Sequence, residues 1–151
     1  MDTGSSAFIL ICSAMVCLMT PALAFFYGGL GRRKNVINTM MMSVLPLAIA
    51  SLLWVVAGYS LSFGGHGYFF GNISHLFLHG VSETASSRGL AIPDLLFAAF
   101  QMMFSIICVA ILTGSVVGRM RFTPLAIFVV FWLLLVYYPF AHMVWGDGIL
   151  A

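Results

Sequence analysis

The side chains best suited to binding a charged ligand are three phenylalanines in one apolar stretch: Phe97, Phe100 and Phe104 recur at spacings of three and four residues. On a helix, side chains at these spacings share one face. Aromatic faces attract cations through their quadrupole, more strongly where water is partly excluded. Counted from Asp94 along a helix, Phe104 lies about 15 Å from the entrance. The spacing therefore allows a cation-attracting face, although an aromatic stripe is more often part of a packed core.

Trp145 and the four histidines are the other candidates for a binding site. His66, His75 and His79 fall in one polar connection without neighbouring cysteines, and zinc sites usually need two close pairs of ligands. We expect no metal and no cofactor. His142 lies about one turn before the end of the last apolar stretch, where it either hydrogen-bonds the backbone or lines an aqueous mouth. Trp145 follows it and is typical of a membrane-interface aromatic or of a cation site.

The elements that must position these side chains are membrane helices, because the 151-residue chain is 62% hydrophobic and only 7% charged. A soluble domain of this size needs far more charge on its surface. About 20 apolar residues are enough to cross a bilayer as a helix. Four stretches without Asp, Glu, Lys or Arg are long enough, and they cover residues 3–31, 35–82, 95–118 and 122–146.

The predicted fold is therefore an all-α membrane protein, a polytopic helix bundle that forms one unit over residues 1–151. The predicted helices span about residues 6–30, 36–63, 94–118 and 123–144. Residues 64–93 form an outer loop rich in Gly, Ser and His, with a short turn expected at ISHLFLH, residues 73–79.

The distribution of charges predicts how this bundle is oriented. The basic residues 32–34 follow the first helix, and Arg119 and Arg121 follow the third, so both clusters lie on one side. The positive-inside rule assigns that side to the cytoplasm. All four acids fall on the opposite side, and Arg88 is the one basic residue that joins them. We expect a plasma-membrane protein whose N-terminus is extracellular or periplasmic.

The predicted membrane helices contain no charged side chain away from their ends. Proton pumps, ion-coupled carriers and voltage sensors usually mark their path with such residues, so these classes are disfavoured. The sequence also shows no Ser–His–Asp order, paired buried carboxylates or phosphate-binding glycine loop. We therefore expect neither an enzyme nor a nucleic-acid partner.

Three segments resemble ammonium transporters of the Amt/Mep/Rh superfamily, specifically its Amt branch. They are AFFYGGLGRRKNVINTMMMS (24–43), AFQMMFSIICVAILTGSVVGRMRF (99–122) and AHMVWGDGILA (141–151). The resemblance implies a homotrimer of eleven-helix subunits, each with its own hydrophobic pore, to which this chain would supply the first four helices. It also implies ammonium or ammonia as substrate, methylammonium as an analogue, contact with membrane lipid, and a trimeric cytoplasmic nitrogen-regulatory partner.

The same resemblance assigns roles to residues within the motifs. Phe104 matches the phenylalanine of the outer gate and cation–π site, and Trp145 matches the tryptophan of that recruitment site. Phe100 and Gln101 match the FQ pair beside the vestibule. Gln101 points about 100° away from Phe100 around the helix, so we expect its amide to tie this helix to a neighbour as structural support. By the same resemblance, five residues match positions near the pore wall and its cytoplasmic exit: Leu23, Phe26, Tyr27, Ile111 and Val144.

Two departures from the family's pattern lead to further expectations. Residue 151 falls at roughly a third of the family's length, upstream of its two pore histidines, and His142 is not one of that pair. We therefore expect residues 1–151 alone not to conduct. Asp147 stands where the family often has glycine, and its carboxylate either attracts cations or is merely solvated. An ammonium sensor built on the same fold is the alternative function, and electrogenic and neutral transport both remain open.

Overall fold

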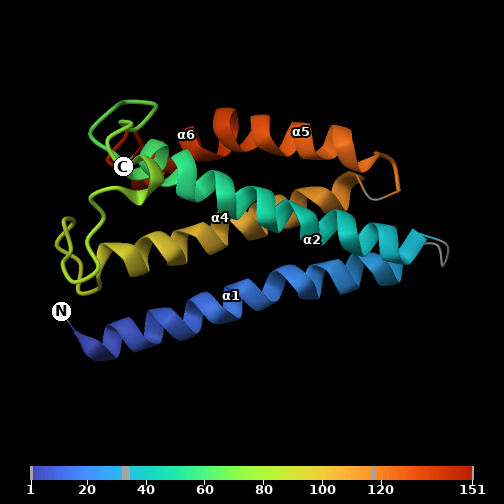
Figure 1. The fold of residues 1–151 in the computed structure, drawn as a ribbon, viewed down its shortest axis with the longest axis horizontal. Helices are drawn as coiled ribbons and strands as arrows, with labels where there is room; N and C mark the ends of the chain where they lie inside the picture. Colours follow the sequence, from blue (N-terminus) through green and yellow to red (C-terminus); the bar gives the residue numbers. More distant parts are fainter. Residues whose placement is uncertain (1, 32–34, 117, 151) are drawn as a thin grey trace.

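The computed structural model describes residues 2–31, 35–116 and 118–150, and its long helices lie side by side (Figure 1). The first rod is α1, Thr3–Leu30. The second rod begins with α2, Val36–Leu53, passes through a π-helical turn, Trp54–Gly58, and ends with α3, Tyr59–Phe63. The chain therefore runs from one end of the bundle to the other and back before it enters the outer loop.

The second half of the chain repeats this path. α4 spans Asp94–Val116. The last rod begins with α5, Phe122–Trp132, passes through a second π-helical turn, Leu133–Tyr137, and ends with α6, Tyr138–Trp145. By length and composition, each of the four rods in the described residues could cross a membrane. The predicted all-α bundle with four membrane-length helices is thus confirmed.

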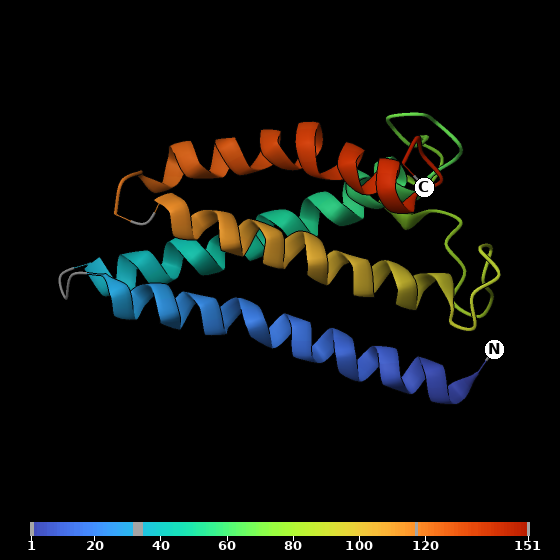
Figure 2. The same ribbon diagram turned by 180° about the vertical axis from the view of Figure 1, so that it is seen from behind.

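Both termini and the outer loop lie at one end of the bundle, as the views from the front and from behind show (Figures 1 and 2). The connection that carries Arg119 and Arg121 lies at the opposite end; residues 32–34, the other predicted basic cluster, lie outside the described residues. Within the loop, a short 3-10 turn at Leu76–Leu78 confirms the turn expected at residues 73–79. The end with the termini and the loop is called the outer end below.

The loop is tied to the second rod by one serine. Ser60 Oγ donates a hydrogen bond to the carbonyl oxygen of Asn72 (2.6 Å) and accepts one from the backbone N–H of His75 (3.0 Å). Ser60 is fully buried, so these bonds satisfy a hydroxyl that would otherwise be unpaired. The loop is therefore folded back on the outer end of the bundle.

The core lies between the second, third and fourth rods and is centred on Trp54. Its indole Nε1 donates to the carbonyl oxygen of Ala98 in α4 (3.1 Å), and its ring meets that of Tyr138 edge-on at 5.8 Å between centroids. Edge-to-face contacts are favourable because the positive edge of one ring meets the negative face of the other. Gly58 lies directly against Tyr138, since a glycine leaves room for the ring.

The first helix begins at Thr3 rather than at residue 6, because Asp2 caps it. The Asp2 carboxylate accepts hydrogen bonds from the N–H of Gly4 (3.3 Å), the N–H of Ser5 (2.9 Å) and the hydroxyl of Ser5 (2.6 Å). Such bonds satisfy amide groups that have no partner in the first turn of a helix. The hydroxyl of Ser5, followed by the two backbone amides, holds the pKa of Asp2 below its usual value.

We predict that this cap protects the Ser5 amide from hydrogen exchange in a pH-dependent way. Because the pKa of Asp2 is lowered in the folded state, the protection is complete above the ordinary carboxyl pKa and is lost as pH falls through the lowered one. Replacing Asp2→Ala should speed exchange of the Ser5 amide about fivefold at neutral pH. Asp2→Asn is the control: it can still cap the helix, so protection should persist without the acid transition. Equal exchange rates in all three proteins would contradict the cap.

Candidate functional site

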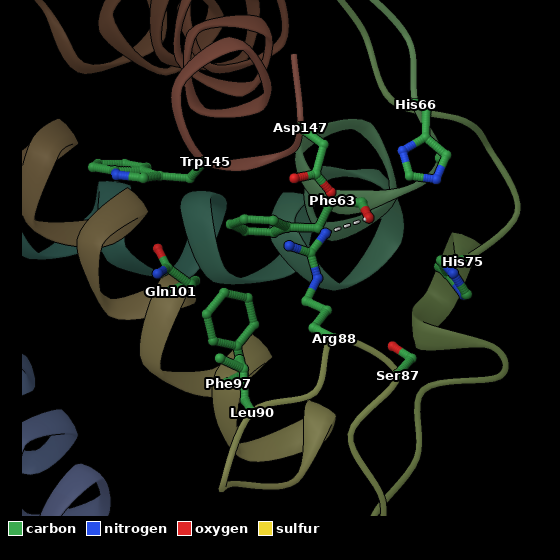
Figure 3. A pocket seen from close by; sticks show the side chains of 11 residues that line it. Phe63, His66, His75, Ser87, Arg88, Leu90, Phe97, Gln101, Trp145 and Asp147 are labelled. Atoms are coloured by element: carbon green, nitrogen blue, oxygen red, sulfur yellow. Dashed lines mark hydrogen bonds between the residues drawn. The ribbon is translucent and has the colours of Figure 1, made fainter. Parts of the chain in front are cut away.

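A cavity of about 520 Å³ opens at the outer end of the bundle (Figure 3). Its wall combines the end of α3, one face of α4, the outer loop and the segment around the end of α6. The lining residues are Phe63, Gly65, His66, His75, Ser87, Arg88, Leu90, Phe97, Gln101, Trp145 and Asp147. The volume falls in the range of small-molecule sites, and the lining mixes aromatic faces with charged groups. This is the outer cavity.

Arg88 reaches from the loop across two aromatic rings of the outer cavity. Its guanidinium carbon lies 4.8 Å from the ring centroid of Phe63 and 5.6 Å from that of Phe97. Nη2 also donates to the carbonyl oxygen of Phe63 at 2.9 Å. The ring centroids of Phe63 and Phe97 lie 5.1 Å apart and the two rings meet edge-on, so both rings contact the guanidinium. This contact explains why one basic residue lies among the acids, because a guanidinium is stabilised over aromatic faces.

Asp147 enters the outer cavity from a tight turn after α6. The turn is held by the N–H groups of Gly146 and Gly148, which both donate to the carbonyl oxygen of His142 at 2.9 and 3.2 Å. Asp147 itself has φ +63°, in the left-handed region that aspartate tolerates better than most residues but less well than glycine. Its carboxylate points toward the guanidinium side of the cavity (Figure 3).

A second cavity, of about 340 Å³, is almost wholly apolar and lies deeper along the fourth rod. It is lined by Cys108, Trp132, Val136, Tyr137, Phe140, Ala141, Val144 and Trp145. Trp145 therefore lines both cavities, with 55% of its side chain exposed. We call this space the apolar cavity; it contains Val144, one of the predicted pore-wall residues.

Phe104 and Phe100 form a pair on α4. Their rings meet nearly at right angles, 87°, with centroids 5.0 Å apart. Phe104 follows Gln101, which lines the outer cavity, by three residues and precedes Cys108, which lines the apolar cavity, by four. These spacings place all three on one helical face, so Phe104 stands between the positions that line the two cavities. Its role as a gate stays a prediction.

Gln101 lies in the outer cavity with Phe97 and Trp145 (Figure 3). Within the described residues its amide makes no hydrogen bond to a neighbouring helix, so the expected supporting role stays a prediction. The side chain is indeed about 100° from Phe100 around the helix, but it is only about 40° from Phe97. Comparison with Phe97 would have placed the amide in the cavity.

Tyr27 and Ile111, two of the residues predicted near the pore wall, are in contact where α1 meets α4. The hydroxyl of Tyr27 in α1 donates to the carbonyl oxygen of Ile111 in α4 at 3.5 Å, and its ring lies against Gly114. Phe26 packs beside Tyr27 with ring centroids 5.8 Å apart and is 60% exposed. Leu23 lies one turn earlier on α1 and is partly exposed. These positions line neither of the two cavities, and their role in a pore stays a prediction.

His142 is fully buried at the outer end of the last rod. Its Nδ1 lies 3.0 Å from the carbonyl oxygen of Ser62, and its Nε2 lies 2.8 Å from that of Gly67. Of the two alternatives for this residue, hydrogen bonding to the backbone is the one observed, and it joins α6 to the end of α3 and the start of the loop. Within the described residues, no group of three or more His, Cys, Asp or Glu side chains is arranged to hold a metal ion.

Comparisons with known proteins agree with this architecture. The sequence model of the Ammonium Transporter Family matches residues 7–151. An ammonium transporter of Bacillus subtilis is 42% identical over 98% of this chain, and a putative ammonium transporter of Methanothermobacter thermautotrophicus is 44% identical over 99% of it. In each case the match covers 37% of the relative, so this chain spans a little over a third of their length.

Solved structures give the same result for the fold. The crystal structure of Candida albicans Mep2 superimposes with a TM-score of 0.87 and 29% identity, covering 98% of this chain and 33% of that protein. Saccharomyces cerevisiae Mep2 gives a TM-score of 0.84 and 31% identity, covering 97% and 35%. The four rods thus match about a third of each larger helical protein.

Proposed function

We propose, on the premise that this chain belongs to the Ammonium Transporter Family, that its outer cavity recruits ammonium for transport across the membrane. The aromatic face of Trp145 attracts the cation, and Phe104 gates the passage from the recruitment site toward a hydrophobic pore. Relatives named ammonium transporters cover nearly the whole chain, which supports ammonium as the substrate.

The observation that carries this proposal is that Trp145 lines two cavities of opposite character. The outer cavity has charged and aromatic walls, whereas almost all of the surface that lines the apolar cavity is apolar. A cation is stabilised over an aromatic face in the first, but its charged form is disfavoured by desolvation in the second. A substrate that can lose a proton can continue as a neutral molecule.

This arrangement discriminates between ions of similar size. Potassium cannot shed its charge, so it meets the full cost of leaving water when it enters an apolar space. Ammonium can release a proton to water in the outer cavity before entry, and neutral ammonia then passes at a far smaller cost. A pore without charged side chains fits this mode of selection.

The proposal for the larger assembly is supported by family membership and not by these four rods. We propose that the protein acts as a homotrimer in the plasma membrane, with the outer end of the bundle facing the extracellular or periplasmic side. The positive-inside rule supports that orientation through Arg119 and Arg121 at the opposite end. A trimeric nitrogen-regulatory protein would then meet the cytoplasmic end.

Substitution of the two assigned aromatic residues tests the recruitment site. In the encoded protein, Phe104→Ala and Trp145→Leu should each raise the KM for methylammonium about threefold to tenfold, because one removes the proposed gate and the other the aromatic face that attracts the cation. Accumulation of labelled methylammonium is measured at low concentrations in cells without another ammonium transporter. Phe69→Ala is the control, since this exposed loop residue lines neither cavity. Wild-type KM values in both variants would show that the site is wrongly assigned.

A further inference from the structure

The outer cavity contains one cation and one anion of the protein itself, Arg88 and Asp147, beside Trp145. We propose that these two side chains set the affinity of the cavity for cations in opposite directions. Arg88 is a resident cation that opposes the recruitment of ammonium, and Asp147 is the carboxylate that favours it. The inference rests on the proposed function and adds two specificity-determining residues to it.

Arg88 is held in place rather than free to swing into solvent. Its guanidinium lies over Phe63 and Phe97, and its hydrogen bond to the carbonyl oxygen of Phe63 fixes one edge. Phe63 is only 4% exposed, so this ring beneath the guanidinium is part of the core. The guanidinium of Arg88 therefore covers the rings of Phe63 and Phe97. Of the Phe and Trp side chains that line the cavity, this leaves Trp145 available to a substrate cation.

The position of Asp147 is equally determined by the backbone. Hydrogen bonds from Gly146 and Gly148 to one carbonyl oxygen hold the turn on both sides of it, and its φ of +63° directs the side chain into the cavity. Among the residues drawn in Figure 3, the marked hydrogen bond of Arg88 goes to Phe63 and not to Asp147. The carboxylate thus faces the same space as the guanidinium without being bonded to it, which leaves its field available to an incoming cation.

The charges of Arg88 and Asp147 both act on a cation bound in the outer cavity, and their effects have opposite signs. A unit charge a few ångströms from the bound cation changes its affinity by about threefold to tenfold, and salt weakens the effect. Removing the guanidinium should therefore tighten cation binding, and removing the carboxylate should weaken it. Removing both should leave the affinity near its original value, because the two changes oppose one another.

The test uses methylammonium accumulation by the encoded protein, at low and high ionic strength and at one fixed pH, because His66 and His75 also line the cavity. Arg88→Met keeps the long apolar stem and removes the charge, so KM should fall about threefold to tenfold. Asp147→Asn keeps a side chain that tolerates the left-handed turn, so KM should rise by a similar factor. Both shifts should shrink in high salt, and the double variant should return toward the wild-type KM.

Matched variants separate charge from folding. Glu83→Gln removes an exposed acid of the same loop that does not line the cavity, and it should leave KM unchanged. Arg88→Lys keeps the charge without the guanidinium, so its KM should lie closer to the wild-type value than that of Arg88→Met. Asp147→Gly relieves the left-handed backbone but should raise KM as Asp147→Asn does. KM values that stay at the wild-type level, or that move in the same direction for Arg88→Met and Asp147→Asn, would overturn the inference.

Failure of this inference can be told apart from failure of the proposed function. If the wild-type protein accumulates no methylammonium, the proposed function is wrong, and the assignment of Arg88 and Asp147 is lost with it. If the wild type accumulates methylammonium and responds to Trp145→Leu, but not to either charge variant, only the inference about Arg88 and Asp147 is wrong.

Discussion

Liposomes that contain only residues 1–151 are expected to show no ammonium-specific uptake. A pore needs a wall on every side, and four rods leave several of the assigned positions open to the surroundings. Phe26, Ile111 and Trp145 are 60%, 57% and 55% exposed. In the most apolar window of α1, only 11% of the residues are buried, against 33% for α4. These apolar faces need further protein before they can enclose a path.

The measurement follows the pH inside the liposomes after an ammonium gradient is applied, since entry of ammonia consumes internal protons. Empty liposomes give the background, and a full-length member of the family gives the positive signal. Circular dichroism of the 1–151 polypeptide in the same lipid verifies that its helices are formed. Uptake above background by residues 1–151, abolished by Phe104→Ala, would show that four helices suffice.

Replacing Gly58 by alanine should cause the largest loss of stability among glycine-to-alanine substitutions at the helix contacts. A Cβ at this position would lie 2.6 Å from Cζ and 2.8 Å from Cε1 of Tyr138, far inside contact distance. Tyr138 is fully buried, and its ring is also packed against Trp54, so it has no room to retreat. Overpacking of this kind typically costs about 1–3 kcal/mol, and we expect Gly58→Ala at the upper end.

Two other glycines provide graded controls for this prediction. At Gly114 the added Cβ would meet the ring and hydroxyl of Tyr27, but this tyrosine is partly exposed and can move away, so the cost should be smaller. At Gly29 no atom lies within 4 Å, so Gly29→Ala should be neutral or slightly stabilising, because alanine favours a helix over glycine. Unfolding of the encoded protein in detergent, followed by circular dichroism, gives the order. Equal stability of Gly58→Ala and Gly29→Ala would show that Tyr138 does not restrict this position.

The helices could be predicted well because charge decides where the chain can enter a membrane. The uncharged stretches of the sequence predicted all four membrane-length helices, and the second of them ends at Phe63 as predicted. The first helix begins earlier than predicted because the Asp2 carboxylate caps it, although such a residue before an apolar run is a known signal. The π-helical turns at Trp54–Gly58 and Leu133–Tyr137 had no comparable signal, since the apolar composition continues through both.

The site was harder to predict because its charged parts come from distant segments. Phe104 and Trp145 were assigned to the site through the motifs in which they lie. Trp145 lines both cavities, whereas Phe104 lies on α4 between the positions that line them, and the roles of both residues stay predictions. Arg88 follows Phe63 by 25 residues, and the contact between them depends on how the whole outer loop folds back. No local pattern marks such a contact, so Arg88 appeared in the sequence only as an exception to the charge rule.

The two π-helical turns have a consequence for how the length of these helices can vary. A π-helical turn takes up one residue more than an α-helical turn. A one-residue deletion within Leu133–Tyr137 can therefore be absorbed by straightening the helix, and Trp145 keeps its direction. The same deletion within α5 would turn everything beyond it by about 100° and move Trp145 away from both cavities. One-residue deletions in this helix are thus tolerated within the π-helical turn and not in the α-helical turns beside it.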